Sequence, residues 1–134
     1  MASGSFWRGL APHLLSLLRL MAGLLLLEFG TMKILHFPYS DYFANVQPWT
    51  LIWVAGVLEL VGGALVTVGL FTRCAAFVLS GEMAFAYFIA HAPKGFFPAL
   101  NEGLAAVLFC FVFLYVSAAG GGPWSLDRMI RKAG

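Results

Sequence analysis

Four glutamates lie inside an otherwise apolar chain, one in each of its four hydrophobic segments: Glu28, Glu59, Glu82 and Glu102. A charge at the centre of a membrane helix costs roughly 2.5–3.5 kcal/mol, so such residues normally face a charged partner or a wet cavity. A carboxyl within hydrogen-bond reach of a bound ligand can also exchange protons with it. The four acids therefore predict a polar interior that binds a ligand or handles protons.

Other polar residues fall toward the outer ends of the same segments. Counting along the chain places Glu59 and Glu82 near the middle of the membrane and Glu28 in the outer half, at ~1.5 Å per residue. We expect a polar funnel that opens on the non-cytoplasmic side. The residues expected to bind a ligand or handle protons are Arg19, Glu28, Lys33, Glu59, Glu82, His91, Asn101 and Glu102.

Glu59 lies between Gly56 and Gly63, at spacings of three and four residues that place all three on one helical face. Small residues on such a face let membrane helices approach closely. The carboxyl of Glu59 should therefore meet a cation, and Arg19 and Lys33 on the first segment are the candidates. An alternative is that this ion pair only fixes the register of two helices.

The histidines and cysteines offer weaker signals. His36 and His91, at similar depth, could ligate haem, or a metal together with Glu102, but haem ligation needs two imidazoles that face each other across the bundle. A histidine bonded to a neighbouring group is commoner, and we predict no metal site and no intrinsic cofactor. Cys74 and Cys110 differ in depth by about half a membrane, which predicts buried, unpaired cysteines.

The elements that position these residues follow from composition. The chain has 134 residues, of which 61% are hydrophobic and only 10% charged, with a mean hydropathy of +0.89. A chain this short cannot bury so much apolar surface away from water, and its apolar segments do not alternate as barrel strands do. We predict one all-α membrane domain over residues 1–134, a bundle of four transmembrane helices near residues 14–36, 50–71, 74–92 and 99–119.

Basic residues predict the orientation of this bundle. Six of them fall on the side that holds both termini, and only Lys33 and Lys94 fall on the other side. By the positive-inside rule both termini are cytoplasmic, and we expect a multi-pass protein of the cell inner (plasma) membrane. The net charge of +2 is explained by this rim and gives no reason to expect nucleic acid. After Pro123, Ser125 should cap a short helix that lies on the lipid surface.

The chain resembles the DoxX family of small four-helix membrane proteins from about Leu18 to Asp127. The resemblance rests on five segments in order: RLMAGLLLLEFGTMKI, GVLELVGGALVTVGLFTR, EMAFAYFIAHAP, PALNEG and GGGPWSLDR. Glu28 departs from the family pattern, which is apolar or small there. The resemblance implies association with quinone-linked oxidoreductases or thiol redox enzymes, and in distant relatives with cargo or receptor handling.

Two functional hypotheses follow. The first is a redox-associated subunit that binds a quinone or a small sulfur or thiol compound, with lipid and an oxidoreductase as partners. The second is a non-enzymatic scaffold, chaperone or transporter-like protein, for which a homo-oligomer is one arrangement. On the first hypothesis Glu59→Gln should abolish binding and leave folding near normal; on the second it should disrupt folding.

Overall fold

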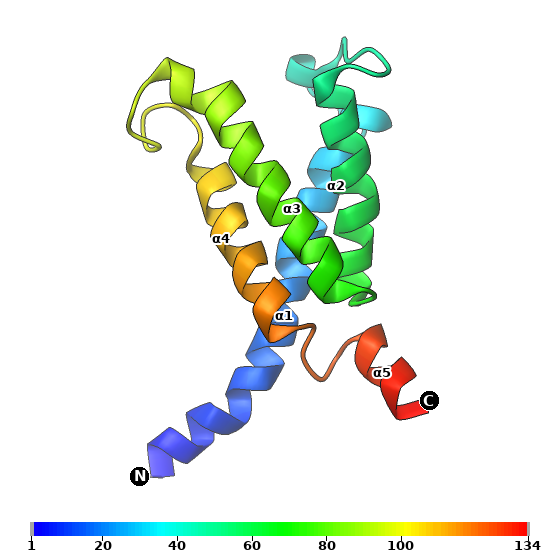
Figure 1. Cartoon of the computed structure of the whole chain (residues 1–134), viewed down its shortest axis with the longest axis vertical. Coiled ribbons are helices and arrows are strands. Elements are labelled where there is room, and N and C mark those ends of the chain that lie inside the picture. Colours follow the sequence, from blue (N-terminus) through cyan, green and yellow to red (C-terminus); the bar gives the residue numbers. More distant parts are fainter. Residues whose placement is uncertain (1, 134) are drawn as a thin grey trace.

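The computed structural model describes residues 2–133, which form helices and loops and no strand. The α-helices are α1 (Ala2–Ile34), α2 (Leu51–Val68), α3 (Thr72–Ala86), α4 (Leu104–Ala119) and α5 (Leu126–Ala133) (Figure 1). Short helical turns cover Asp41–Phe43, Tyr87–His91 and Ala92–Lys94. The Tyr87–His91 turn continues α3 as a π-helix.

Three helical segments of the described chain are long and apolar enough to cross a membrane: Gly4–Ile34, Leu51–Val68 and Thr72–Lys94. A fourth, Leu104–Ala119, is apolar and 16 residues long. The prediction of a helical membrane protein is confirmed. Four complete spans and the cytoplasmic side of the termini stay predictions.

Two helix boundaries differ from the predicted ones by more than three residues, and the others lie closer. The first helix begins at Ala2 rather than at residue 14, because the chain stays helical through Pro12, and its beginning projects away from the other helices (Figure 1). The last long helix begins at Leu104 rather than at residue 99. Residues 97–101 form a turn in which the N–H groups of Leu100 and Asn101 both bond to the carbonyl of Phe97.

Helices α1 and α2 pack backbone to backbone through glycines. A Cβ atom on Gly30 would lie 2.5 Å from the backbone nitrogen of Leu60, and one on Gly63 would lie 2.9 Å from the Cα of Leu27. A Cβ atom on Gly23 would likewise lie 2.7 Å from the backbone nitrogen of Thr67. The Gly63 contact confirms the packing face expected from the glycine spacing around Glu59, and the three contacts together fix the antiparallel register of the two helices.

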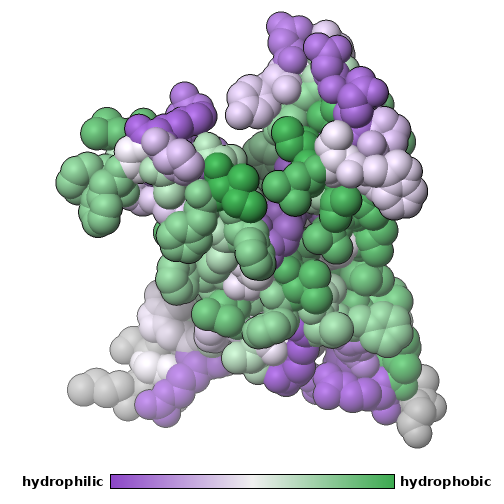
Figure 2. All heavy atoms as spheres, turned by 45° about the horizontal axis from the view of Figure 1, so that its top comes forward, coloured by the Kyte–Doolittle hydropathy of each residue, from purple (hydrophilic) through white to green (hydrophobic). Residues whose placement is uncertain are grey.

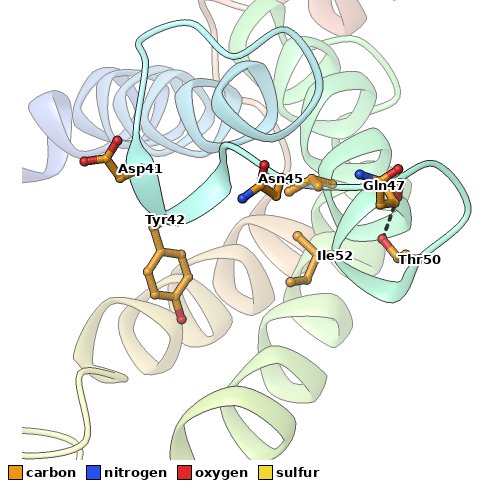
Figure 3. Close-up of a pocket in the computed structure, with 7 residues that line it drawn as sticks. Asp41, Tyr42, Asn45, Gln47, Thr50 and Ile52 are labelled. Carbon is orange, nitrogen blue, oxygen red and sulfur yellow. Dashed lines mark hydrogen bonds between the residues drawn. The ribbon is translucent and has the colours of Figure 1, made fainter.

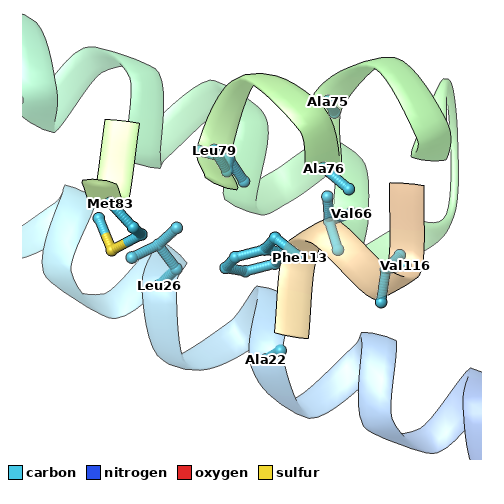
Figure 4. Packing of buried hydrophobic residues seen from close by; sticks show 9 residues of the cluster. All are labelled: Ala22, Leu26, Val66, Ala75, Ala76, Leu79, Met83, Phe113 and Val116. Carbon is cyan, nitrogen blue, oxygen red and sulfur yellow. The ribbon is translucent and has the colours of Figure 1, made fainter. Parts of the chain in front are cut away.

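The bundle is closed at one end and splayed at the other. At the end that carries both termini, the termini end, the α1–α2 and α3–α4 pairs converge. At the opposite loop end, which carries residues 35–50 and 95–103, they diverge (Figure 1). The fully buried Phe113 lies in a core to which all four helices contribute (Figure 4). Its buried members are Ala22, Leu26, Val66, Ala75, Ala76, Leu79, Met83, Phe113 and Val116.

At the termini end, residues 120–127, the tail segment, are bonded to α1. Ser16, 1% exposed, donates from Oγ to the carbonyl of Gly121 (3.0 Å) and accepts from the N–H of Trp124 (3.1 Å). One turn along α1, Arg19 donates from Nη2 to the carbonyl of Trp124 (2.7 Å). Polar groups that the tail would otherwise leave buried are therefore paired with α1.

Asp127 ties the tail segment to the start of α3. Its carboxylate accepts hydrogen bonds from the backbone N–H groups of Phe71 and Thr72, both 2.9 Å long, and its own N–H donates to the carbonyl of Gly69. Burial raises the pKa of Asp127, but the bonds from Thr72 and Phe71 and the charge of Arg131 outweigh it, so the pKa lies below its ordinary value. Asp127 thus caps α3, whose own N-cap residue, Phe71, makes no side-chain cap.

The short C-terminal helix begins as predicted. Ser125 accepts a hydrogen bond at Oγ from the N–H of Arg128 (3.2 Å), which caps α5. The location of α5 on a lipid surface stays a prediction.

Candidate functional site

A buried ion pair joins α1 and α2 in the half of the bundle nearer the loop end. Lys33 Nζ lies 2.8 Å from Oε1 and 2.9 Å from Oε2 of Glu59. The side chain of Glu59 is 1% exposed and that of Lys33 is 13% exposed. The prediction that Glu59 meets a cation is confirmed, and that cation is Lys33.

The alternative prediction, that Arg19 is the partner of Glu59, is wrong, because Arg19 lies at the termini end of α1. It is 14 residues from Lys33 on one helix, about 21 Å along the axis. Its guanidinium is buried against the tail segment, where it bonds to the carbonyl of Trp124.

Two glycines allow Lys33 and Glu59 to approach each other. A Cβ atom on Gly56 would lie 2.8 Å from the Cβ of Lys33, and one on Gly30 would lie 2.9 Å from the backbone carbonyl carbon of Glu59. Larger residues would separate the helices and lengthen the ion pair. The glycine pattern and the charged pair therefore belong to one arrangement.

Glu82 on α3 extends this arrangement across the bundle. Both of its carboxyl oxygens are buried, and neither accepts a hydrogen bond from an N–H or hydroxyl group of the described residues. The carboxyl lies against that of Glu59, so one of the two acids, when protonated, can donate a hydrogen bond to the other, and the charges of Glu59 and Lys33 also act on it. We call these three residues the Lys33–Glu59–Glu82 cluster. Within it Glu59 is paired with Lys33, whereas Glu82 has no cation of its own.

The surface of the loop end is hollowed. Figure 2 shows a hollow between the two lobes of the loop end, with hydrophilic side chains visible deep inside it. On the α1–α2 side, the ring of Phe43 lies 5.3 Å from Nζ of Lys33, within the range of a cation–π contact. Phe43 belongs to the short helix after Ser40, and its contact with Lys33 could not be predicted from the sequence, because it depends on how the loop folds back.

The same loop forms a pocket of its own (Figure 3). Its lining residues belong to the loop and to the first turn of α2: Asp41, Tyr42, Asn45, Val46, Gln47, Thr50 and Ile52. Thr50 donates from Oγ1 to the carbonyl of Gln47 (2.7 Å), which holds the wall of the pocket. None of the three cluster residues lines this pocket, so it is distinct from the buried charges.

His91 and Asn101 fix the loop between α3 and α4. Asn101, 1% exposed, donates from Nδ2 to the Tyr87 hydroxyl (3.1 Å) and to the carbonyl of Gly95 (2.9 Å). Its Oδ1 accepts from the N–H of Gly103 (2.9 Å). His91 Nδ1 lies 3.2 Å from the backbone oxygen of Asn101. The amide of Asn101 is therefore already occupied by loop contacts.

The remaining two predicted site residues lie on the surface. Glu102 is 77% exposed and 3.6 Å from Nζ of Lys94. Glu28 is exposed on α1 and takes part in neither of the ion pairs found among the described residues. The eight predicted residues thus separate into the cluster, a loop group of His91, Asn101 and Glu102, the buried Arg19 and the exposed Glu28.

Cys74 and Cys110 are both free thiols, as predicted, but only Cys110 is partly buried. Cys74 is exposed, so its predicted burial is wrong. Cys74 lies in the first turn of α3, whose packed face is formed by Ala75, Ala76 and Leu79 instead. In the part of the chain that the structure describes, no three His, Cys, Asp or Glu residues are grouped as a metal site would require.

Comparison with known proteins identifies the family. A model of the DoxX family matches residues 14–92, more than half of the chain. The chain belongs to the DoxX family. It is 44% identical over 125 residues to an uncharacterized protein from Haemophilus influenzae, covering 90% of this chain and 93% of that protein. No solved structure matches the chain significantly. The matched region contains all three residues of the Lys33–Glu59–Glu82 cluster.

Proposed function

We propose that this DoxX protein is a redox-associated membrane subunit that binds the polar head of a quinone, or a small sulfur or thiol compound, at the Lys33–Glu59–Glu82 cluster. The observation that carries the proposal is Glu82, whose two carboxyl oxygens are buried and accept no hydrogen bond from an N–H or hydroxyl group of the described residues. A buried polar group in this state costs about 1–3 kcal/mol, and a ligand or water that bonds to it recovers that energy.

Lys33 supplies a second contact point. An ammonium group has three N–H donors, and Glu59 accepts from Lys33 at two oxygens. One donor is left for a ligand oxygen or sulfur atom. The ring of Phe43, 5.3 Å from Nζ, offers an apolar surface beside that donor. A planar ring with hydrogen-bonding atoms at its edge could contact both the remaining N–H of Lys33 and the ring of Phe43.

In this function the chain binds the quinone and protonates it, and the electrons come from a partner oxidoreductase. Reduction of a quinone consumes two electrons and two protons for each quinol formed. Glu82 would pass one of the two protons to a bound carbonyl, because it is the acid of the cluster not engaged by Lys33. Water then reprotonates Glu82 and also supplies the second proton. Glu59 holds Lys33 in position.

The test compares Glu82→Gln with Glu102→Gln in lipid nanodiscs, using a short-chain quinone and thiosulfate as probes and calorimetric titration as the measurement. We expect one probe to bind the parent protein, Glu82→Gln to weaken binding about tenfold, and Glu102→Gln to leave it unchanged. A tenfold change corresponds to about 1.4 kcal/mol, within the roughly 0.5–1.5 kcal/mol that one hydrogen bond typically contributes. Equal binding by both variants, or no binding of either probe to the parent, would contradict the proposal.

A scaffold is the second candidate, and the closed ion pair favours it. Both oxygens of Glu59 are bonded to Lys33 at the glycine contact between α1 and α2, an arrangement that fixes helix register without a ligand. For a scaffold, Glu82→Gln removes a buried unpaired acid and should raise thermal stability in nanodiscs while no probe binds.

A further inference from the structure

Glu28 lies at mid-depth in the bundle, on a face that no part of the described chain covers. Its height follows from the glycine contacts on either side of it: Gly30 touches Leu60, and Leu27 touches Gly63. Glu28 is therefore level with residues 61 and 62 of α2. These lie about 15 Å from the start of α2 at Leu51 and about 9 Å from its end at Val68.

The surroundings of Glu28 are apolar. Leu24 and Leu25 on the same helix are 42% and 46% exposed, and Val61 at the same height on α2 is 54% exposed. A glutamate side chain is too short to reach the membrane surface from this depth, unlike lysine or arginine. A charge here costs roughly 2.5–3.5 kcal/mol unless a partner meets it.

The carboxyl lies in an open groove along α1. The groove is lined by Leu24, Leu27, Glu28, Thr31, Phe37 and Pro38. The α1 residues in this set recur at intervals of three and four, so the groove runs along one helical face. Thr31 donates its hydroxyl to the backbone carbonyl of Glu28 and leaves the carboxylate to another partner. The shape suits a second helix lying beside α1.

We infer that this groove docks a transmembrane helix of a different protein, and that a lysine or arginine near the middle of that helix pairs with Glu28. Charge complementarity argues against a second copy of this chain. Lys33 is already bound to Glu59, Arg19 is buried against the tail segment, and Lys94 lies in the loop beyond α3. The other described arginines, Arg8, Arg73, Arg128 and Arg131, lie at the termini end. A parallel copy would instead bring its own Glu28 toward this one.

A photo-reactive phenylalanine analogue at position 24, in the full chain in its native membrane, tests the inference. Irradiation followed by mass spectrometry should identify a peptide of another membrane protein with a lysine or arginine within about one helical turn of the cross-linked residue. Glu28→Gln should lower the yield of that product about tenfold. The matched control, Glu102→Gln, removes an exposed carboxyl at the loop end and should leave the yield unchanged.

A charge exchange then tests the pairing itself. Glu28→Lys should abolish the cross-link, and replacing the basic residue of the partner by glutamate should restore it. The inference is overturned if the cross-linked product is a second copy of the chain or only lipid, if the partner segment has no basic residue at that depth, or if the exchange restores nothing. Because Glu28 and the Lys33–Glu59–Glu82 cluster are on different faces, these outcomes do not depend on the proposed ligand.

Discussion

The two ends of this bundle hold their polar groups in different ways. At the termini end, the side chains of Ser16, Arg19 and Asp127 bond to backbone groups more than 50 residues away in sequence. At the loop end, the tightest polar contact between α1 and α2 is the Lys33–Glu59 ion pair. Each end also keeps buried side-chain atoms that no described donor or acceptor meets: Nε and Nη1 of Arg19 and Oγ1 of Thr72 at the termini end, and the carboxyl oxygens of Glu82 beside the ion pair.

The difference shows which end can move. Bonds from side chains to backbone at the termini end join α1, α3 and the tail segment, and the buried core lies beside them. We therefore expect the termini end to be the more rigid of the two. At the loop end the two helix pairs diverge (Figure 1), and regions with few buried contacts open at lower free energy. A ligand that bonds to Glu82 would therefore bind where the structure adapts most easily.

Breaking the ion pair should have the largest effect. Glu59→Gln leaves the ammonium of Lys33 buried without its counter-charge, and the expected loss is about 3–5 kcal/mol of unfolding free energy. The measurement is denaturant titration in mild detergent. This outcome differs from what the ligand-binding hypothesis predicted from the sequence, near-normal folding, and agrees with what the scaffold hypothesis predicted, because both oxygens of Glu59 are bonded to Lys33.

The double variant Lys33→Met with Glu59→Leu is the control for this prediction. It removes both charges and keeps an apolar contact between α1 and α2, so most of the lost stability should return. If the single and double variants are equally unstable, the ion pair is not what holds the loop end of α1 and α2 together.

Removing the cap of α3 should have a smaller effect at the termini end. Asp127→Asn weakens the hydrogen bonds to the N–H groups of Phe71 and Thr72, and we expect a loss of about 1 kcal/mol at neutral pH. Because the pKa of folded Asp127 lies below its ordinary value of 3.8, the cap stabilises fully above that pH. Its contribution is lost as the pH falls through the lower, folded value.

The check is the difference in thermal unfolding midpoint between the parent and Asp127→Asn, measured at neutral pH and again below pH 3.8. The difference should shrink in acid, since protonation of the parent then removes the same charge. A difference that stays constant with pH would mean that the carboxylate is not the stabilising group.

The smallest effect is expected at the exposed pair of the loop end. Lys94 and Glu102 are 3.6 Å apart, and their side chains are 46% and 77% exposed. Exposed pairs contribute little, so Glu102→Gln should stay within about 0.5 kcal/mol of the parent in the same titration. If Glu102→Gln lost as much unfolding free energy as Glu59→Gln, burial would not be the reason why the Lys33–Glu59 pair contributes more than the Lys94–Glu102 pair.

Much of the fold could be predicted from the sequence. Apolar segments separated by proline and glycine predicted a helical membrane protein, and Ser125 after Pro123 predicted the start of α5. The glycine spacing around Glu59 predicted a close helix contact and a cation for that acid. These features depend on local periodicity and on the cost of an unpaired charge in a membrane, and both can be read along one chain.

Other features were decided only by the tertiary structure. Arg19 and Lys33 share a face of α1, and the antiparallel register of α2 decided that Lys33 meets Glu59 while Arg19 meets the tail segment. The rotation of α1 placed Glu28 outside the bundle. The sequence thus determined which residues need partners, because burial of a polar group has the same cost in any fold. Register and rotation decided which partner each one has, because they depend on contacts between segments far apart in the chain.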